Sequence, residues 1–106
     1  MAEDRKEPLK LLGFVGGSRS DLKGFPDEVR QEIGYAIYVA QQGRKHRSAK
    51  PMNGFHGAGV LEVVEDHDGD TYRAVYTVKF KRVLYVLHVF QKKSVKGSKR
   101  RSTKLI

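Results

Sequence analysis

The chain has 106 residues, of which 39% are hydrophobic and 31% charged, which is typical of one globular domain and not of a disordered segment. It has no cysteine, which excludes disulfides and thiolate chemistry and fits the cytoplasm, and no apolar run approaches the roughly 20 residues that cross a membrane. The start, MAEDRKEPLK, lacks the apolar core of a secretory signal. We therefore expect a single domain over residues 1–106, with a basic tail from about residue 92 and no membrane contact.

The net charge of +9 is unevenly distributed along the chain. Residues 1–40 hold six basic and seven acidic residues, whereas residues 41–106 hold fifteen basic and five acidic ones. A positive half attracts phosphate backbones in a salt-dependent way, and it would equally attract an acidic protein. We favour nucleic acid or a ribonucleoprotein as the partner over a purely solubilising role for the charge.

The first half of the chain predicts a strand and a helix. LKLLGFV (9–15) has the composition of a strand and is followed by paired glycines, which permit a turn. A helix is expected over residues 26–42, because Pro26 suits the first helical position, two acidic residues follow it at the positive end of the helix dipole, and Gly43 is a natural end. Apolar residues at helical spacing predict one buried stripe: Val29, Ile33, Ala36, Ile37 and Ala40.

The second half predicts three strands. Residues 44–59 are basic and glycine-rich and are expected to form a loop. Strands are expected over 60–66, 71–80 and 83–90, with a tight turn at HDGD. Short connections favour an antiparallel meander with the helix across one face. The predicted fold class is therefore α+β.

The last two strands present two different surfaces if their turn lies at Lys81-Arg82. Arg73 then faces Phe90 and Val75 faces His88 on a mixed surface, which also carries Lys79 and is continued by Lys92. The opposite surface is apolar and should meet the helix: Ala74, Tyr76, Val78, Tyr85, Leu87 and Val89. We expect the mixed surface to be open and to carry function.

The sequence contains no P-loop, GxSxG or HExxH motif, and its four histidines lack metal-ligand spacing. Metal-free RNA cleavage needs neither a metal nor a cysteine, because the 2′-OH is the nucleophile. Arg73 could hold phosphate through its fork, with Lys92 or His88 assisting by proton transfer. The alternative for Arg73 is a structural ion pair with Glu62 or Glu65 on the neighbouring strand.

The segment GVLEVVEDHDGDTYRAVYTVKFKRVLYVLHVFQKKSVKG resembles the phage-derived branch of the RelE/HigB toxin family. The resemblance is carried by the LEV strand, by YRAVYTV, and by LYVLHVFQKKS with its paired lysines, and upstream by FPDEVRQEIGYAIYVAQQG and KPMNGFHGAGV. It implies a RelE-like α+β fold, a curved antiparallel sheet of about four strands with one or two helices on one face. It also implies ribosome-dependent mRNA cleavage, that is, an endoribonuclease or mRNA interferase without a cofactor.

The resemblance further implies partners and site residues. The partner would be a helix-turn-helix antitoxin of the HigA type, with operator DNA bound only through the antitoxin. The family's strand arginine corresponds to Arg73, its basic residues after the last strand to Lys92 and Lys93, and its loop basic residues to Lys50 and His56. With His88 added from its place on the mixed surface, the expected catalytic residues are Arg73, Lys92 and His88. The expected RNA contacts are Lys50, His56, Lys79, Phe90 and Lys93.

Two alternatives remain open from the sequence. The ending GSKRRSTKLI departs from the threonine-proline step and further helix of that family branch, which motivates a non-catalytic relative that binds RNA or the antitoxin without cutting. A DNA-binding module is disfavoured, because the main helix begins with acids and has only Arg30 as a basic residue.

Overall fold

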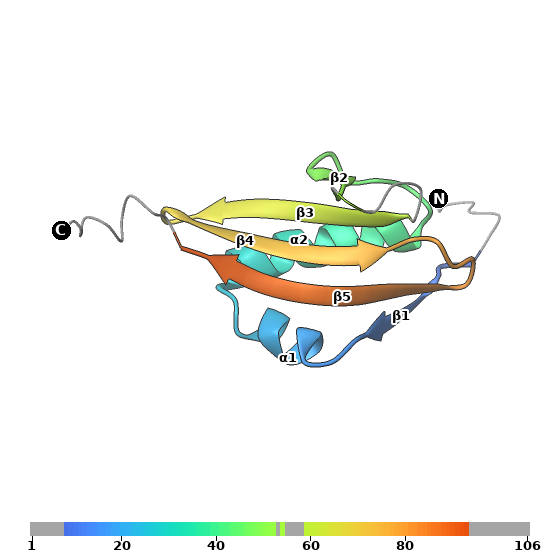
Figure 1. Ribbon diagram of the computed structural model, residues 1–106, viewed down its shortest axis with the longest axis horizontal. Coiled ribbons are helices and arrows are strands. Elements are labelled where there is room, and N and C mark those ends of the chain that lie inside the picture. Colours follow the sequence, from blue (N-terminus) through green and yellow to red (C-terminus); the bar gives the residue numbers. More distant parts are fainter. Residues whose placement is uncertain (1–7, 53, 55–58, 94–106) are drawn as a thin grey trace.

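The computed structural model describes residues 8–52, 54 and 59–93, which form one sheet with two helices (Figure 1). The helices are α1 (Ser18–Lys23) and α2 (Asp27–Gln41). The strands are β1 (Leu11–Phe14), β2 (Ala49–Pro51), β3 (Val60–His67), β4 (Asp70–Thr77) and β5 (Val83–Lys92). The sheet order is β1-β5-β4-β3-β2, and α2 lies across one face of it. In this part of the chain no helix is long and apolar enough to cross a membrane.

The α+β class and the helix-covered sheet are confirmed, with two corrections. The sheet has five strands and not about four, because Ala49–Pro51, within the expected loop, pairs with β3. In addition, β1 runs parallel to β5, whereas the other pairs are antiparallel. A parallel neighbour needs a crossover connection, and here the chain makes it through both helices before returning to the sheet.

Helix α2 follows the predicted pattern closely. It begins at Asp27, one residue later than expected, because Pro26 has an extended ψ of 149° and occupies the N-cap position. Every residue of the predicted stripe is buried against the sheet. Gly43, with a φ of 84°, ends the helical stretch in a conformation that favours glycine.

The β3–β4 turn also matches its sequence signal. Asp68 and Gly69 both have positive φ, 51° and 84°, as a two-residue turn between twisted strands requires. The turn places β3 and β4 in register over their full eight residues.

A β-bulge divides the last hairpin into two registers. The pairs Arg73–Phe90 and Val75–His88 are as predicted, but Tyr76 pairs with Val86, so Leu87 is an extra residue. The turn-side pairs that a Lys81-Arg82 turn predicts, Tyr76 with Leu87 and Thr77 with Val86, are therefore wrong.

The shift also corrects which side chains face the helix. Leu84 and Val86 enter the core with Tyr76, whereas Tyr85 lies outside it and is 36% exposed. Leu87, also expected on the apolar surface, is only partly buried. The bulge is the physical reason, because one inserted residue reverses the alternation of side chains along a strand.

Tyr76 tests this core directly. Its side chain is fully buried, burial raises the pKa of its hydroxyl to about 12, and no described residue hydrogen-bonds to that hydroxyl. Tyr76→Phe is expected to keep or raise the free energy of unfolding, because it removes a buried polar group that lacks a protein partner. Tyr76→Ala should cost about 3–5 kcal/mol through the cavity it leaves. Urea denaturation of both variants checks this, and a Tyr76→Phe loss comparable to that of alanine would contradict it.

Candidate functional site

The open face of the sheet, the face away from α2, carries three rows of side chains set by strand register. The first row is Lys50, Glu62, Val75 and His88; the second is Val64, Arg73 and Phe90; the third is Asp66, Thr71 and Lys92. The alternate residues of the same strands, such as Val63, Ala74 and Val89, lie in the core; within the first row, Glu62 and Val75 are also buried. The open face therefore gathers charged and aromatic groups on a surface that no described helix covers.

Arg73 lies at the centre of the open face and is paired with Glu62. Its Nη1 donates to Glu62 Oε2 at 3.0 Å, with side-chain exposures of 28% and 12%. Its Nε is buried and has no partner among the described residues. The ion pair considered for Arg73 is present, yet the guanidinium is on the open face and not in the core. The remaining terminal nitrogen, Nη2, has no hydrogen bond to a described residue.

The other two residues expected in catalysis are neighbours of Arg73 on this face. Phe90 is directly opposite Arg73, so His88 and Lys92 are its two diagonal neighbours on β5. Such diagonal positions lie about 7–8 Å apart, within reach of long side chains. Both are exposed, and the His88 ring stacks on Phe90 with centroids 5.0 Å apart. The structure thus brings Arg73, His88 and Lys92 together.

The residues expected to contact RNA are more dispersed. Lys50 faces Glu62 from β2, and exposed Lys93 follows β5. Lys79 lies beyond the other end of the hairpin, with its ammonium 5.6 Å from the Phe80 ring centroid. Because β5 is ten residues long, its two ends are about 30 Å apart. Lys79 and Lys92 cannot hold the same phosphodiester. His56 and the basic tail beyond residue 93 lie outside the described residues.

Glu62 was expected only as an ion-pair partner that would give Arg73 a structural role, yet it is itself a component of this site. It is nearly buried, faces Lys50 across one strand boundary, and binds Arg73 across the other. A carboxylate in that position orients the guanidinium and sets its distance from β3. The segment VLEVVED indicates this role, because its first acid lies on the strand face opposite the buried Val63.

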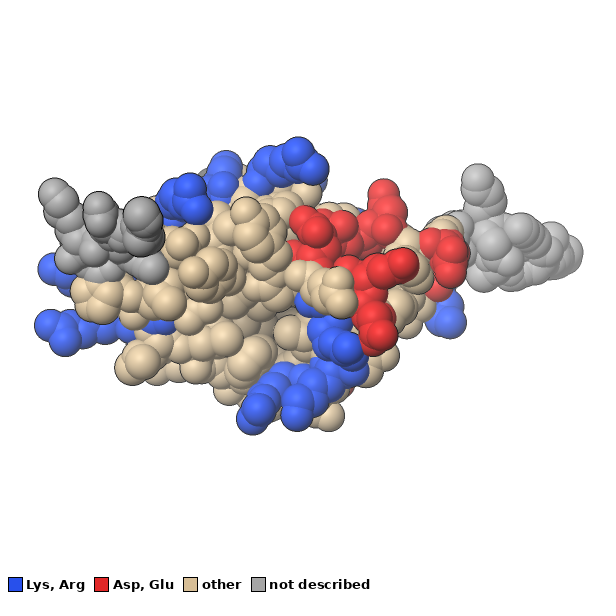
Figure 2. Space-filling view, turned by 180° about the vertical axis from the view of Figure 1, so that it is seen from behind, with Lys and Arg blue, Asp and Glu red and all other residues tan. Residues whose placement is uncertain are grey.

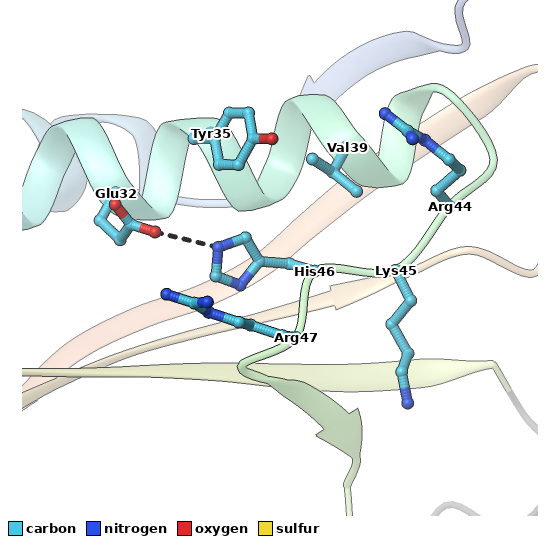
Figure 3. A pocket seen from close by; sticks show the side chains of 7 residues that line it. All are labelled: Glu32, Tyr35, Val39, Arg44, Lys45, His46 and Arg47. Carbon is cyan, nitrogen blue, oxygen red and sulfur yellow. Dashed lines mark hydrogen bonds and ion pairs between the residues drawn. The ribbon is translucent and has the colours of Figure 1, made fainter.

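A separate cavity of about 410 Å³ lies between α2 and the loop that precedes β2 (Figure 3). Buried His46 joins the two elements: its Nδ1 accepts from the Ser48 amide at 3.0 Å, so its Nε2 donates to Glu32 at 2.9 Å. The cavity is lined by Glu32, Tyr35, Val39, Arg44, Lys45, His46 and Arg47. None of these residues belongs to the open face, so we interpret His46 as a packing group that fixes the loop.

The helix side of the molecule is not uniformly positive. Figure 2 shows acidic side chains gathered at one end of that side, whereas lysines and arginines lie elsewhere around the rim. Asp27 and Glu28 open α2, and Glu28 lies 3.4 Å from His67, which also contacts Asp68. An acidic surface repels phosphate, so this end of the helix side is unsuited to an RNA backbone.

No group of three or more His, Asp or Glu side chains that could hold a metal ion occurs in the described part of the chain. The described residues of the open face offer the guanidinium of Arg73, the ammonium groups of Lys50 and Lys92, the imidazole of His88 and the carboxylates of Glu62 and Asp66. These groups can bind a phosphate, stabilise negative charge on it, and move protons.

Glu65 gives a pH-dependent test of the helix side. Its pKa is raised, first by partial burial and then by the charges of Glu32 and Asp66, while His46 and Arg47 act in the opposite direction. A carboxyl with a raised folded-state pKa destabilises the fold once it is charged, and this cost is absent below its ordinary pKa of 4.5. Glu65→Gln is therefore expected to raise the Tm at pH 7, with the gain shrinking as the pH falls through that range.

Thermal denaturation between pH 3.5 and 8 checks this expectation. The control is Glu28→Gln, which removes an exposed carboxylate near His67 and is not expected to raise the Tm. A Glu65→Gln gain that persists unchanged at pH 3.5 would show that its cause is not the carboxyl's charge.

Comparison with known proteins shows which family and which solved structures the chain is similar to. A family model described as phage derived protein Gp49-like (DUF891) matches residues 20–105. Toxin RelE from Escherichia coli, in a mutant solved in the free state, is similar with a TM-score of 0.57 and 18% identity over 86% of this chain and 88% of that one. The toxin–antitoxin complex RelBE2 from Mycobacterium tuberculosis gives 0.52 and 20% over 84% and 98%. No curated protein matched the chain.

Proposed function

Because the chain belongs to the phage-derived Gp49-like family and has a RelE-like fold, we propose that it is the toxin of a type II toxin–antitoxin module and cuts mRNA on the ribosome. The observation that carries the proposal is the convergence of Arg73, His88 and Lys92 on one open sheet face. The site of action is then the cytoplasm, where ribosomes are. The partner is an antitoxin of the HigA type with a helix-turn-helix domain, through which alone the module contacts operator DNA.

The proposed reaction uses the RNA's own 2′-OH. Its oxygen attacks the adjacent phosphorus, the bond to the 5′ oxygen of the next nucleotide breaks, and the products are a 2′,3′-cyclic phosphate and a 5′-OH. One proton leaves the 2′-OH and one arrives at the departing oxygen, so no co-reactant is consumed. Arg73 stabilises the charge that develops on the phosphoryl oxygens, and His88 and Lys92 are the proton-transfer groups beside it.

The shape of the face supports a requirement for the ribosome. The three residues stand on one broad sheet face, and His88 and Lys92 are exposed there. Alignment of the reacting atoms supplies a large part of the acceleration in such reactions. We infer that the ribosome holds the mRNA in the required geometry while this face supplies the charged groups.

Arg73→Ala is the primary test. Loss of the guanidinium is expected to lower the rate of mRNA cleavage in a translation extract by about 10²–10³-fold, as removal of a preorganised charge-stabilising donor does elsewhere. Arg30→Ala is the matched control, because that guanidinium lies on α2 and pairs with Asp27 away from the open face. Intact mRNA with the unaltered protein, or equal cleavage by Arg73→Ala, would remove the proposal.

Glu62→Gln tests whether the ion pair orients Arg73 for this role. The glutamine keeps the size of the side chain but loses the charge-assisted bond, so cleavage should fall by about tenfold, the equivalent of about 1.4 kcal/mol. The fold should survive, because the glutamine amide oxygen can still accept the hydrogen bond from Arg73 Nη1. Cleavage that rises instead would mean that Glu62 restrains Arg73 by neutralising it.

That last outcome bears on the second candidate function, a relative that binds without cutting. The observation in its favour is the 3.0 Å pair itself, which commits part of the Arg73 charge to Glu62. Such a protein would sediment with ribosomes and with the antitoxin but leave mRNA intact. Cuts at a fixed position within codons would exclude it.

A further inference from the structure

A groove lies beside the open face, between α1 and the end of β5. Strand β1 pairs with β5 only as far as Val86, so the edge of β5 after Val86 has no described strand beside it. Helix α1 stands next to this edge, and the two border an open groove of about 470 Å³. Its lining residues are Ser20, Asp21, Gly24, Phe25, His88, Val89, Phe90 and Gln91.

One side of the groove is aromatic. The rings of Phe90 and His88 are stacked, with their planes 24° from parallel, and both residues line the groove. Flat aromatic surfaces next to a phosphate-binding group are where single-stranded RNA bases stack. Because Phe90 is directly opposite Arg73, a base on its ring would belong to a nucleotide whose phosphate lies near the guanidinium.

The other side of the groove is acidic. Asp21 is exposed, and its carboxylate has no hydrogen-bond or ion-pair partner within the described residues. A carboxylate repels phosphate, so this side of the groove does not fit an RNA backbone. It fits a base edge that presents two adjacent N–H donors.

Among the four RNA bases, guanine has that edge. Its N1–H and N2–H₂ donate side by side and match the two oxygens of a carboxylate. Adenine and cytosine each place a donor next to an acceptor, and uracil places its single N–H between two carbonyls. We propose that the groove binds a guanine of the RNA, stacked on Phe90 and hydrogen-bonded to Asp21. This proposal rests on the proposed function and adds a base preference to it.

Titration of the ¹⁵N-labelled protein with mononucleotides tests the site without ribosomes. Guanosine monophosphate is expected to shift the amide signals of residues 20–25 and 88–91. It should bind about tenfold more tightly than inosine monophosphate, which lacks the N2 amine, and more tightly than the adenosine and cytidine nucleotides, as the loss of one bidentate pair predicts. Equal affinities, or shifts that map elsewhere, would overturn the proposal.

Two variants separate the parts of the site. Asp21→Asn should abolish the difference between guanosine and inosine monophosphate, whereas Glu28→Gln, which removes an acid from the helix side, should keep it. Phe90→Leu should weaken all four nucleotides by a similar factor, because stacking does not distinguish the bases. A guanosine preference that survives Asp21→Asn would exclude Asp21 as the reading group.

Mapping of mRNA ends distinguishes this proposal from the function on which it rests. Cuts that need Arg73 but show no guanine beside the cut, and that do not change in Asp21→Asn, overturn the base site and leave the nuclease standing. Guanosine binding in the groove of a protein that cuts no mRNA would support the base site and overturn the nuclease. Cuts next to guanine that lose this preference in Asp21→Asn support both.

Discussion

The extra residue in β5 decides what each face of the sheet presents. With Leu87 inserted opposite the Val75–Tyr76 step, Leu84 and Val86 face the helix on one side of the bulge and Val89 faces it on the other. Strict alternation through the same stretch would turn either the first pair or the last residue away from the core. The bulge allows one strand to fill the core along its length and still direct His88, Phe90 and Lys92 outward.

The open face depends on that division, and Arg73 occupies its centre. The Arg73 side chain is about three-quarters covered, so its guanidinium needs a carboxylate or a phosphate to compensate its lost hydration. Glu62 supplies that compensation through one terminal nitrogen, and the other has no hydrogen bond to any residue that the structure describes. The Arg73–Glu62 ion pair is thus compatible with a functional role for Arg73, because a guanidinium held by a carboxylate on one side can still bind an anion on the other.

The charged and polar side chains of the molecule form separate groups on the helix side, on the open face and in the α1 groove. The helix side holds the packing histidine His46, with its bonds to Glu32 and Ser48, and an acidic end around α2 and the β3–β4 turn. The open face holds the cations and the imidazole, and the α1 groove beside it holds an acid next to stacked rings. Under the proposed function, the cationic surface would bind the RNA backbone and the acidic, aromatic groove would bind a base, because a phosphate and a base edge differ in charge and in hydrogen-bonding groups.

Local patterns in the sequence were enough for α2, the β3–β4 turn, the three long strands and the placement of Arg73, His88 and Lys92 on one face, because each depends on spacing within one segment or on a short turn. Tertiary structure alone decided the rest: the three-residue strand β2, the parallel partner of β1, the register beyond the bulge, the binding of Arg73 by Glu62, and the groove that α1 forms against β5. These features depend on pairing and packing between separate segments, and those interactions outweigh any local preference.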